Sequence, residues 1–271
     1  MTRSYFLLLI YLIISPFIIL QGCVKTITSG QIRGNLIEVL NNINSYCYEM
    51  EMDMETSIED STQIVKSNGN GNIDTKNKRM KISININETP DKGKSKSTQT
   101  EIYIFDVMEY IQSGKDGKWI KFEVPRNKLD SENQLKKQMK LVMTSKIKTL
   151  KEERYKSIDC YVLSIEPDKQ SFWKIIMGQE EEHPLLKLLN LDYENVVKQA
   201  DMKVWIEKNT FFPINCIMQM KAVIERKIMK APFNMIINTK LAYRYYDHNK
   251  PLAIKLTKQA KKAEIYEEEW D

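Results

Sequence analysis

Apolar and polar side chains alternate in several stretches of this chain. In 46–56 (YCYEMEMDMET), tyrosine and methionine occupy one parity, and glutamate or aspartate fills most of the other. Successive side chains of a strand point to opposite faces, so this stretch predicts a strand with one apolar and one polar face. Comparable stretches predict strands at 61–67, 80–87, 101–108, 109–112, 119–124, 160–166, 202–208, 214–225 and 234–245.

Other segments have the spacing of amphipathic helices. Apolar residues recur every three or four positions in 30–44 and in 131–150, which predicts two helices. Ser131 and Gln134 resemble a capping box at the start of the second helix. Two shorter helices are expected, at 171–177 and directly after Pro184.

The remaining segments predict turns, and together the elements predict a fold class. Glycine and asparagine in SNGNGN (67–72) and glycine in SGKDGK (113–118) favour turns. We expect an α+β protein with a long curved antiparallel sheet of roughly 8–11 strands in up-and-down order, because sheets of this size tend to curl. Its apolar face would need cover, so the helices are placed over the concave side of a half-barrel.

The N-terminal segment indicates export. Arg3 precedes an uncharged run over 4–24, which is typical of a secretory signal peptide and is also long enough for a permanent membrane anchor. Leu20-Gln21-Gly22-Cys23 resembles the lipobox of exported lipoproteins. That resemblance implies a diacylglyceryl group and acyl chains such as palmitate on Cys23, with cleavage just before it. A retained anchor and a cleaved soluble form are the alternatives, and all three place the body outside the cytoplasm.

The predicted domain organisation follows from these segments. It comprises a signal peptide with lipobox at 1–22, a lipidated N-terminus with the first helix at 23–45, a half-barrel domain at 46–258, and a charged tail at 259–271.

Composition excludes several classes of protein. Charged residues make up 28% and hydrophobic residues 42%, which is too polar for a protein with many membrane spans. The net charge of +5 comes from interleaved acidic and basic residues, whereas a nucleic-acid-binding protein would show a basic face. We therefore expect no nucleic acid partner, and we expect a monomer anchored to the cell membrane through Cys23.

Candidate catalytic chemistry is sparse. His183 and His248 have no Cys or His neighbour at metal-ligand spacing. The chain has no nucleophile elbow, phosphate-binding glycine loop or dinucleotide fingerprint. We expect no metal, no cofactor and no enzymatic activity.

Three cysteines remain if Cys23 carries lipid. Cys47, Cys160 and Cys216 allow at most one intramolecular disulfide, and the sequence does not choose among the three pairings. Each lies in a predicted strand, so buried free thiols are the favoured interpretation.

The order of elements resembles the LolA/LppX-like lipoprotein fold. The local matches are the helix followed by a strand at 30–56, the hairpin segment GKDGKWIKF at 114–122, and VWIEKNTFFP at 204–213; the resemblance covers most of 30–258. It implies a curved sheet whose concave face and helices enclose an apolar cavity for acyl chains. It implies no catalytic residues.

Methionines are concentrated on the apolar parity of the predicted strands. Methionine is unbranched and polarizable, and surfaces that accept varied partners use it often. These residues either pack as core against the helices or line a cavity with variable contents. The candidate ligand-lining residues are Tyr48, Met50, Met52, Met54, Ile82, Ile84, Met202, Val204, Met218, Met220, Met235 and Ile237.

Two functional hypotheses follow from this pattern. In the first, the protein is a membrane-anchored carrier or sensor that binds an acyl chain, lipid or lipoprotein in the half-barrel. In the second, it is a cell-surface interaction protein with a self-filled core that binds another envelope protein.

Overall fold

The computed structural model describes residues 27–114, 117–177, 192–228 and 231–266. Several sequence predictions fall outside these residues: the signal peptide at 1–22, the lipidation site Cys23, His183, the helix after Pro184, and the end of the charged tail. Among the described helices, none combines the length and the apolar character needed to cross a bilayer.

The described chain folds into one long sheet with helices packed on one side. The helical segments are α2 Ser29–Asn42, α3 Lys128–Ser131, α4 Gln134–Thr144, α5 Lys169–Ile176, α7 Tyr193–Val196 and the short 3-10 helix η1 Ala260–Lys262. The strands are β1 Ser45–Ile58, β2 Ser61–Asp74, β3 Arg79–Pro90, β4 Lys96–Phe105, β5 Met108–Ser113, β6 Ile120–Glu123, β7 Lys146–Tyr155, β8 Ile158–Glu166, β9 Val197–Glu207, β10 Pro213–Ile228, β11 Ala231–Tyr246 and β12 Glu264–Ile265.

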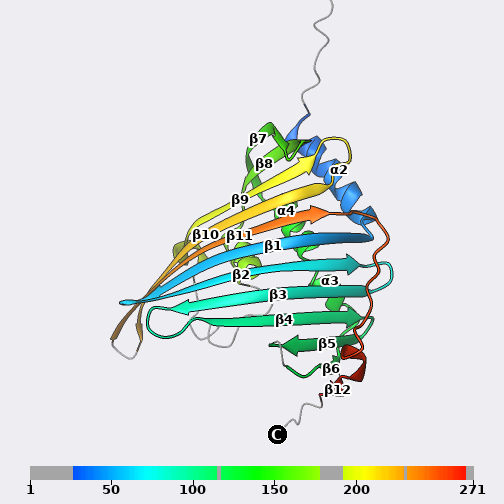
Figure 1. Cartoon of the computed structure of the whole chain (residues 1–271). Coiled ribbons are helices and arrows are strands. Elements are labelled where there is room, and N and C mark those ends of the chain that lie inside the picture. Colours follow the sequence, from blue (N-terminus) through cyan, green and yellow to red (C-terminus); the bar gives the residue numbers. More distant parts are fainter. Residues whose placement is uncertain (1–26, 115–116, 178–191, 229–230, 267–271) are drawn as a thin grey trace, which may run out of the picture.

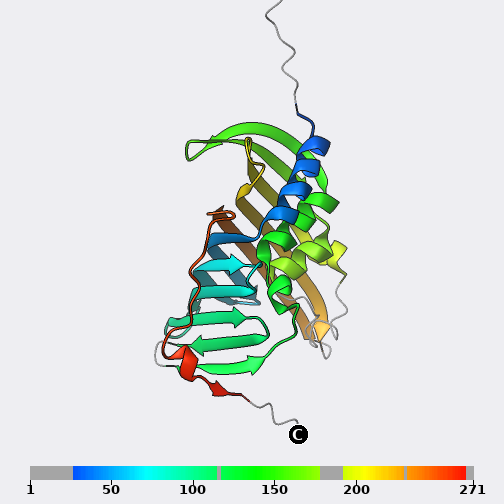
Figure 2. The ribbon, with the colours of Figure 1, turned by 90° about the vertical axis from the view of Figure 1, so that its right-hand side faces the viewer.

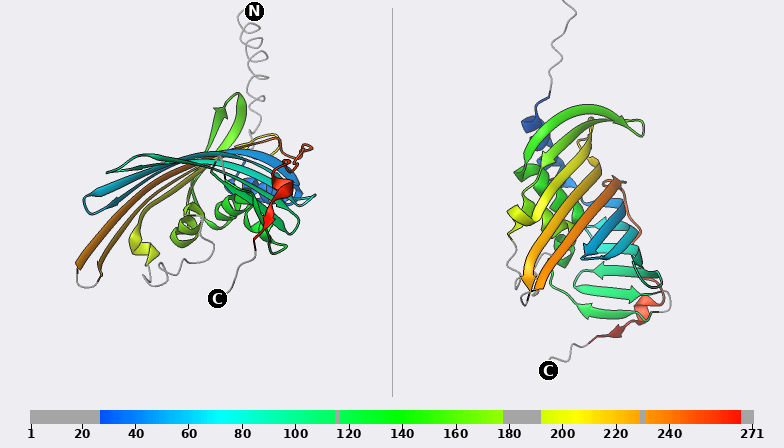
Figure 3. Two further views of the ribbon diagram at one scale, coloured as in Figure 1. Left: turned by 60° about the horizontal axis from the view of Figure 1, so that its bottom comes forward. Right: turned by 90° about the vertical axis from the view of Figure 1, so that its left-hand side faces the viewer.

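Twelve strands pair in the order β12-β6-β5-β4-β3-β2-β1-β11-β10-β9-β8-β7. Only β12 pairs parallel, with β6; the other neighbours are antiparallel. The sheet arches over the helices without closing (Figures 1 and 3). The predicted α+β half-barrel is therefore confirmed.

The predicted up-and-down order is correct within two blocks and wrong between them. β1 to β6 form one meander and β7 to β11 another, and they join where β1 pairs with β11. Helices α3 and α4 lie between β6 and β7 in the chain and cross the face of the sheet, so these two strands lie toward opposite edges (Figure 2). The first strand thus lies in the middle of the sheet.

The predicted helix over 131–150 is wrong beyond residue 144. Helix α4 ends at Thr144, its C-cap Ser145 has an extended backbone, and the chain continues as β7. A β-bulge between Ile147 and Thr149 lets Ile147 face Ile165 and Leu150 face Leu163, although they are three positions apart. That bulge reproduces helical spacing within a strand. The predicted capping box is also wrong, because the Asn133 side chain caps α4 by accepting from the Lys136 amide.

The turn predicted at 67–72 is part of strand β2. Tyr48 pairs with Gly71 across the β1–β2 ladder, and its ring lies where a Cβ on Gly71 would stand. A Cβ on Gly69 would likewise lie only 2.7 Å from the Ser83 carbonyl oxygen of β3. The glycines serve close packing inside a strand rather than a change of direction.

Candidate functional site

The candidate ligand-lining residues share one face of the sheet. We call this the inner face, because side chains of its parity contact the helices: the Tyr46 hydroxyl bonds to Asn133, and the Tyr245 hydroxyl bonds to Gln138. Registers place Met52, Leu241, Met218 and Met202 opposite one another across β1, β11, β10 and β9. The methionines that alternate with charged residues along the sequence therefore meet in rows across the sheet.

Burial divides these residues into two groups. The buried group belongs to the main hydrophobic core and comprises Tyr48, Ile82, Met202, Val204, Met218, Met220 and Ile237. The partly buried group packs against that core and comprises Met50, Met52, Met54, Ile84 and Met235. Val204 and Met218 are 0% exposed, so they act as core of this conformation.

A tyrosine cluster anchors the helices to the inner face. Tyr46, Tyr48, Tyr243 and Tyr245 are all at most 5% exposed. The rings of Tyr243 and Tyr245 are stacked, with centroids 5.9 Å apart. Burial raises the pKa of each of these four phenols, since the charged form would lose its hydration. The cluster therefore stays neutral at physiological pH.

The helices cover the inner face over only part of the length of the strands. On the apolar parity of β1, Tyr46 is 1% exposed and Tyr48 is 4% exposed, whereas Met50, Met52 and Met54 are only partly buried. Ile84 of β3 and Ile102 of β4 are also partly buried on this face. We call these five residues (Met50, Met52, Met54, Ile84 and Ile102) the inner strip.

Five buried side-chain polar atoms of the described residues have no hydrogen-bond partner, and Ser145 Oγ and His248 Nε2 are two of them. The other three are Thr239 Oγ1 of β11, Gln138 Nε2 of α4 and Trp173 Nε1 of α5. Thr239 is the clearest, since it is 5% exposed and its cross-strand neighbours are Met54 and Met220. Each of these groups can donate a hydrogen bond to a polar atom of a ligand. None of the three belongs to the predicted site, because neither their burial nor their lack of partners has a sequence signal.

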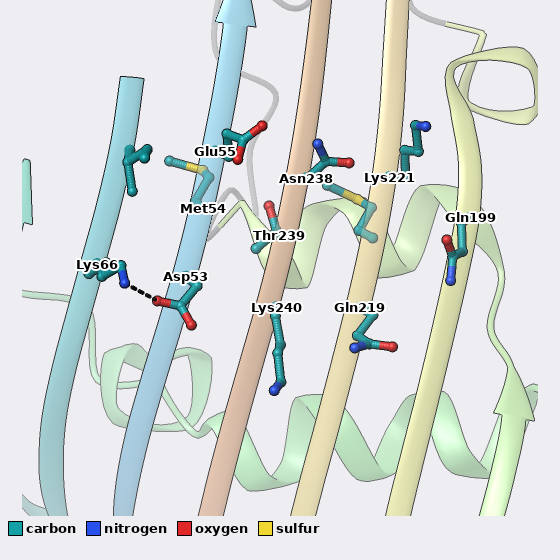
Figure 4. A pocket seen from close by; sticks show the side chains of 12 residues that line it. Asp53, Met54, Glu55, Lys66, Gln199, Gln219, Lys221, Asn238, Thr239 and Lys240 are labelled. Carbon is teal, nitrogen blue, oxygen red and sulfur yellow. Dashed lines mark ion pairs between the residues drawn. The ribbon is translucent and has the colours of Figure 1, made fainter. Parts of the chain in front are cut away.

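Several hollows lie on the opposite, outer face of the sheet. One of 490 Å³ is lined mainly by polar side chains, including Asp53 of β1, Lys240 of β11 and Gln219 of β10. Figure 4 shows these three side chains next to one another across adjacent strands, with the Lys66–Asp53 ion pair alongside. The sequence predicted this face to be a solvated polar surface and did not predict that it is hollowed.

The remaining chemistry predictions concern cysteine, histidine and metals. Cys47, Cys160 and Cys216 are free and buried, as the favoured interpretation predicted. His248 stacks on Phe212 at 4.5 Å, and burial lowers its pKa to about 4. In the part of the chain that the structure describes, no group of three or more His, Cys, Asp or Glu side chains is arranged to hold a metal ion.

Comparisons with solved structures give distant similarities. A DUF1329 family protein from Desulfovibrio piger is 10% identical, over 83% of this chain and 95% of that chain, with a TM-score of 0.28. A beta-barrel-like protein of domain of unknown function DUF1849 from Brucella abortus is 10% identical, over 76% and 100%, with a TM-score of 0.24. Lipovitellin, from a structure describing its lipid–protein interactions, is 6% identical, with a TM-score of 0.35; the match covers 78% of this chain and 26% of that chain. At these values the similarities carry no argument about function.

Sequence comparisons point to one family. The profile of a family of unknown function, DUF6612, matches residues 28–264, which is nearly all of the described chain. No curated protein matches.

Proposed function

This chain belongs to the DUF6612 family, whose function is unknown, and we propose that it binds an apolar ligand such as an acyl chain, lipid or lipoprotein on the inner face of its half-barrel. As a carrier or sensor it acts as a monomer, and its role includes no catalytic step. The observation that carries the proposal is the gradient of burial along β1, from the covered Tyr46 and Tyr48 to the partly exposed methionines.

The composition of the inner strip suits apolar ligands of variable shape. Met50, Met52 and Met54 have three side-chain torsions each and adapt to irregular shapes. Each methylene group of a bound acyl chain that leaves water contributes about 0.8 kcal/mol, so a short length of chain gives appreciable affinity. The unpartnered Thr239 hydroxyl adds a place for a polar atom of an amphiphile.

The proposal also includes a lipid anchor at Cys23 that holds the body outside the cytoplasm, as in exported lipoproteins. Its support is the lipobox-like sequence Leu20-Gln21-Gly22-Cys23. Two or more acyl chains are sufficient for stable membrane attachment. Cys23→Ala should release the protein from the membrane fraction, and mass spectrometry of the wild type should show the mass of the lipid group. Membrane attachment of Cys23→Ala through an intact N-terminal segment would instead support a retained anchor.

The experiment for ligand binding compares two tryptophan substitutions on one strand. Met52→Trp fills the inner strip, whereas Glu51→Trp places the same ring on the outer face as a matched control. Proteins purified gently from membranes are extracted with solvent, and the lipid bound per protein is measured by mass spectrometry. We expect lipid with the wild type and with Glu51→Trp, and at least fivefold less with Met52→Trp. Lipid-free wild type after incubation with varied lipids would overturn the proposal, as would equal loss in both variants.

A second role is supported by the buried group of candidate residues. Because Val204 and Met218 are fully enclosed, much of the inner face is filled by its own side chains, as in a surface protein that binds another envelope protein. In that case Met52→Trp leaves partner binding unchanged, and no lipid copurifies with any of the three proteins.

A further inference from the structure

The outer face carries a trough built from three adjoining hollows. Their volumes are 490, 400 and 380 Å³. Lys240 lines all three, while Trp205 and Ile217 line both smaller hollows. The trough follows β1 from Glu49 to Glu55, a length of about 20 Å at the rise of a strand. Most of its lining side chains lie on the face opposite to the inner strip, while Met54, Met220 and Thr239 also border the hollow of 490 Å³.

The β7–β8 hairpin forms one wall of this trough. Figure 3 shows the hairpin projecting on the side of the sheet away from the helices. Glu153 near its tip accepts a 3.0 Å hydrogen bond from Trp205 Nε1, and the Tyr155 ring lies 5.9 Å from the Trp205 ring. Tyr155 is partly exposed and lines the hollow of 400 Å³. The wall thus combines an aromatic ring with a carboxylate whose orientation is fixed.

Asn215 is a polar side chain that lines the trough and has no partner among the described residues. It is 5% exposed, it lines the hollow of 400 Å³, and no hydrogen bond joins its side-chain amide to another described residue. A β-bulge between Pro213 and Asn215 interrupts the β9–β10 ladder at this point, and bulges redirect side chains. Its amide is not among the fully buried unpartnered groups, so it is accessible from the trough and can exchange hydrogen bonds with a ligand there.

The trough carries both signs of charge in nearly equal number, which disfavours a strongly charged ligand. The three hollows together are lined by six carboxylates and seven lysine or arginine side chains, so the two signs nearly cancel. A polyanion would meet the carboxylates of Glu49, Glu51 and Asp53, and a polycation would meet Lys156, Lys240 and Arg244. An acyl chain would have to remove water from both sets of charges. The surface therefore favours a neutral ligand rich in polar groups.

We infer that this trough binds a neutral, hydroxyl-rich ligand of the oligosaccharide class. A sugar hydroxyl both donates and accepts, so adjacent hydroxyls can satisfy the amide of Asn215, which has two donors and one acceptor. The carboxylate of Glu51 accepts from hydroxyls, and Lys240, which has no ion pair within the described residues, donates to them. The partly exposed Tyr155 ring, with the Lys156 ammonium 5.7 Å from its centroid, adds aromatic surface against which a sugar ring can pack. Its charged and polar lining side chains lie on the face opposite to the proposed lipid site.

The test is calorimetric titration of the protein purified from membranes in a detergent without a sugar headgroup. The probes are cellohexaose and N-acetylchitohexaose, which are neutral, and a heparin oligosaccharide and a chitosan oligomer, which are charged. We expect at least one neutral probe to bind, and Asn215→Leu and Tyr155→Ala each to weaken that binding tenfold or more. Asn87→Ala is the matched control, because Asn87 is exposed on the outer parity of β3 and lines none of the three hollows.

Misfolding is separated from loss of binding by a stability measurement. Asn215→Leu replaces an amide without a protein partner by an apolar side chain of similar volume, so its melting temperature should stay close to that of the wild type. Failure of both neutral probes to bind overturns the inference, and so does wild-type affinity in both trough variants. Binding of the charged probes alone also overturns it, since that result identifies a general charged surface.

Discussion

The Tyr46 hydroxyl donates a 2.8 Å hydrogen bond to the Asn133 side chain, across 87 positions of sequence. The same Asn133 oxygen accepts from the Lys136 amide and so caps helix α4. One buried oxygen therefore both starts the helix and attaches it to the first strand of the sheet. Because α4 covers the inner face where Tyr46 lies, this contact helps to determine how far the cover extends along β1.

Removing the Asn133 side chain should destabilise the fold strongly. Asn133→Ala loses the cap, at about 1 kcal/mol, and leaves the buried Tyr46 hydroxyl without its side-chain acceptor, at about 1 kcal/mol more, since the Leu135 backbone still bonds to it. Tyr46→Phe keeps the cap and should lower the free energy of unfolding by only about 1 kcal/mol. Urea denaturation measures both values.

The control for this prediction is Asn127→Ala. Asn127 precedes α3 in the same way, but its side chain makes no capping hydrogen bond and it is exposed. It should change the free energy of unfolding by a few tenths of a kcal/mol. Equal losses for Asn127→Ala and Asn133→Ala would show that the Tyr46 contact contributes little.

Gly71→Ala should destabilise the sheet, whereas Gly34→Ala should stabilise the protein. A Cβ at Gly71 would overlap the ring of Tyr48, and overpacking of this kind costs about 1–3 kcal/mol. Gly34 is exposed in α2 with open space around its missing Cβ, so alanine there should add about 0.5–1 kcal/mol through helix propensity. Chemical denaturation of the two variants tests the prediction, and a neutral Gly71→Ala contradicts it.

His248 should make the stability depend on pH. Burial lowers its pKa to about 4, with the hydrogen bond to the Pro213 carbonyl and the charge of Asp247 acting in the opposite direction. Between that value and the unfolded pKa of about 6.5, the unfolded chain binds the additional proton, so stability falls as pH decreases. From pH 7 to 4.5 this loss amounts to about 2 kcal/mol.

The measurement is urea denaturation of wild type and His248→Phe at both pH values. The variant keeps an aromatic ring against Phe212 and removes the titrating group. The difference in unfolding free energy between the two proteins should shift by about 2 kcal/mol in favour of the variant at pH 4.5. An unchanged difference would show that His248 titrates normally in the folded protein.

Thiol labelling should separate the folded from the unfolded protein. Cys160 and Cys216 are 0% exposed and Cys47 is 6% exposed, and burial raises the pKa of each thiol. Because the thiolate is the reactive form, iodoacetamide should label the native protein slowly. Unfolding without reductant should release three reactive thiols. A single reactive thiol would reveal a disulfide, and four would show that Cys23 carries no thioether.

Part of the candidate site was accessible from sequence, and part was not. Alternation along β1 places Met50, Met52 and Met54 on one face because strand geometry has a period of two. Which of the twelve lining candidates are enclosed depends on where α4 and α5 lie, and those positions follow from contacts such as Tyr245 to Gln138. The outer trough had no sequence signal, since it requires the β7–β8 hairpin to project beside Trp205 and β1 to pair with β11.

The errors have the same origin. The spacing of Ile147 and Leu150 predicts a helix, and only the bulge opposite Leu163 and Ile165 makes it compatible with a strand. Gly69 and Gly71 predict a turn, but both lie within β2, and the Tyr48 ring occupies the place of a Cβ on Gly71. The sequence by itself determined the α+β class, the apolar face and the strands, because side-chain periodicity is local. Only the tertiary structure decided the central position of β1, the extent of the helix cover and the outer trough, because each depends on contacts between residues far apart in the chain.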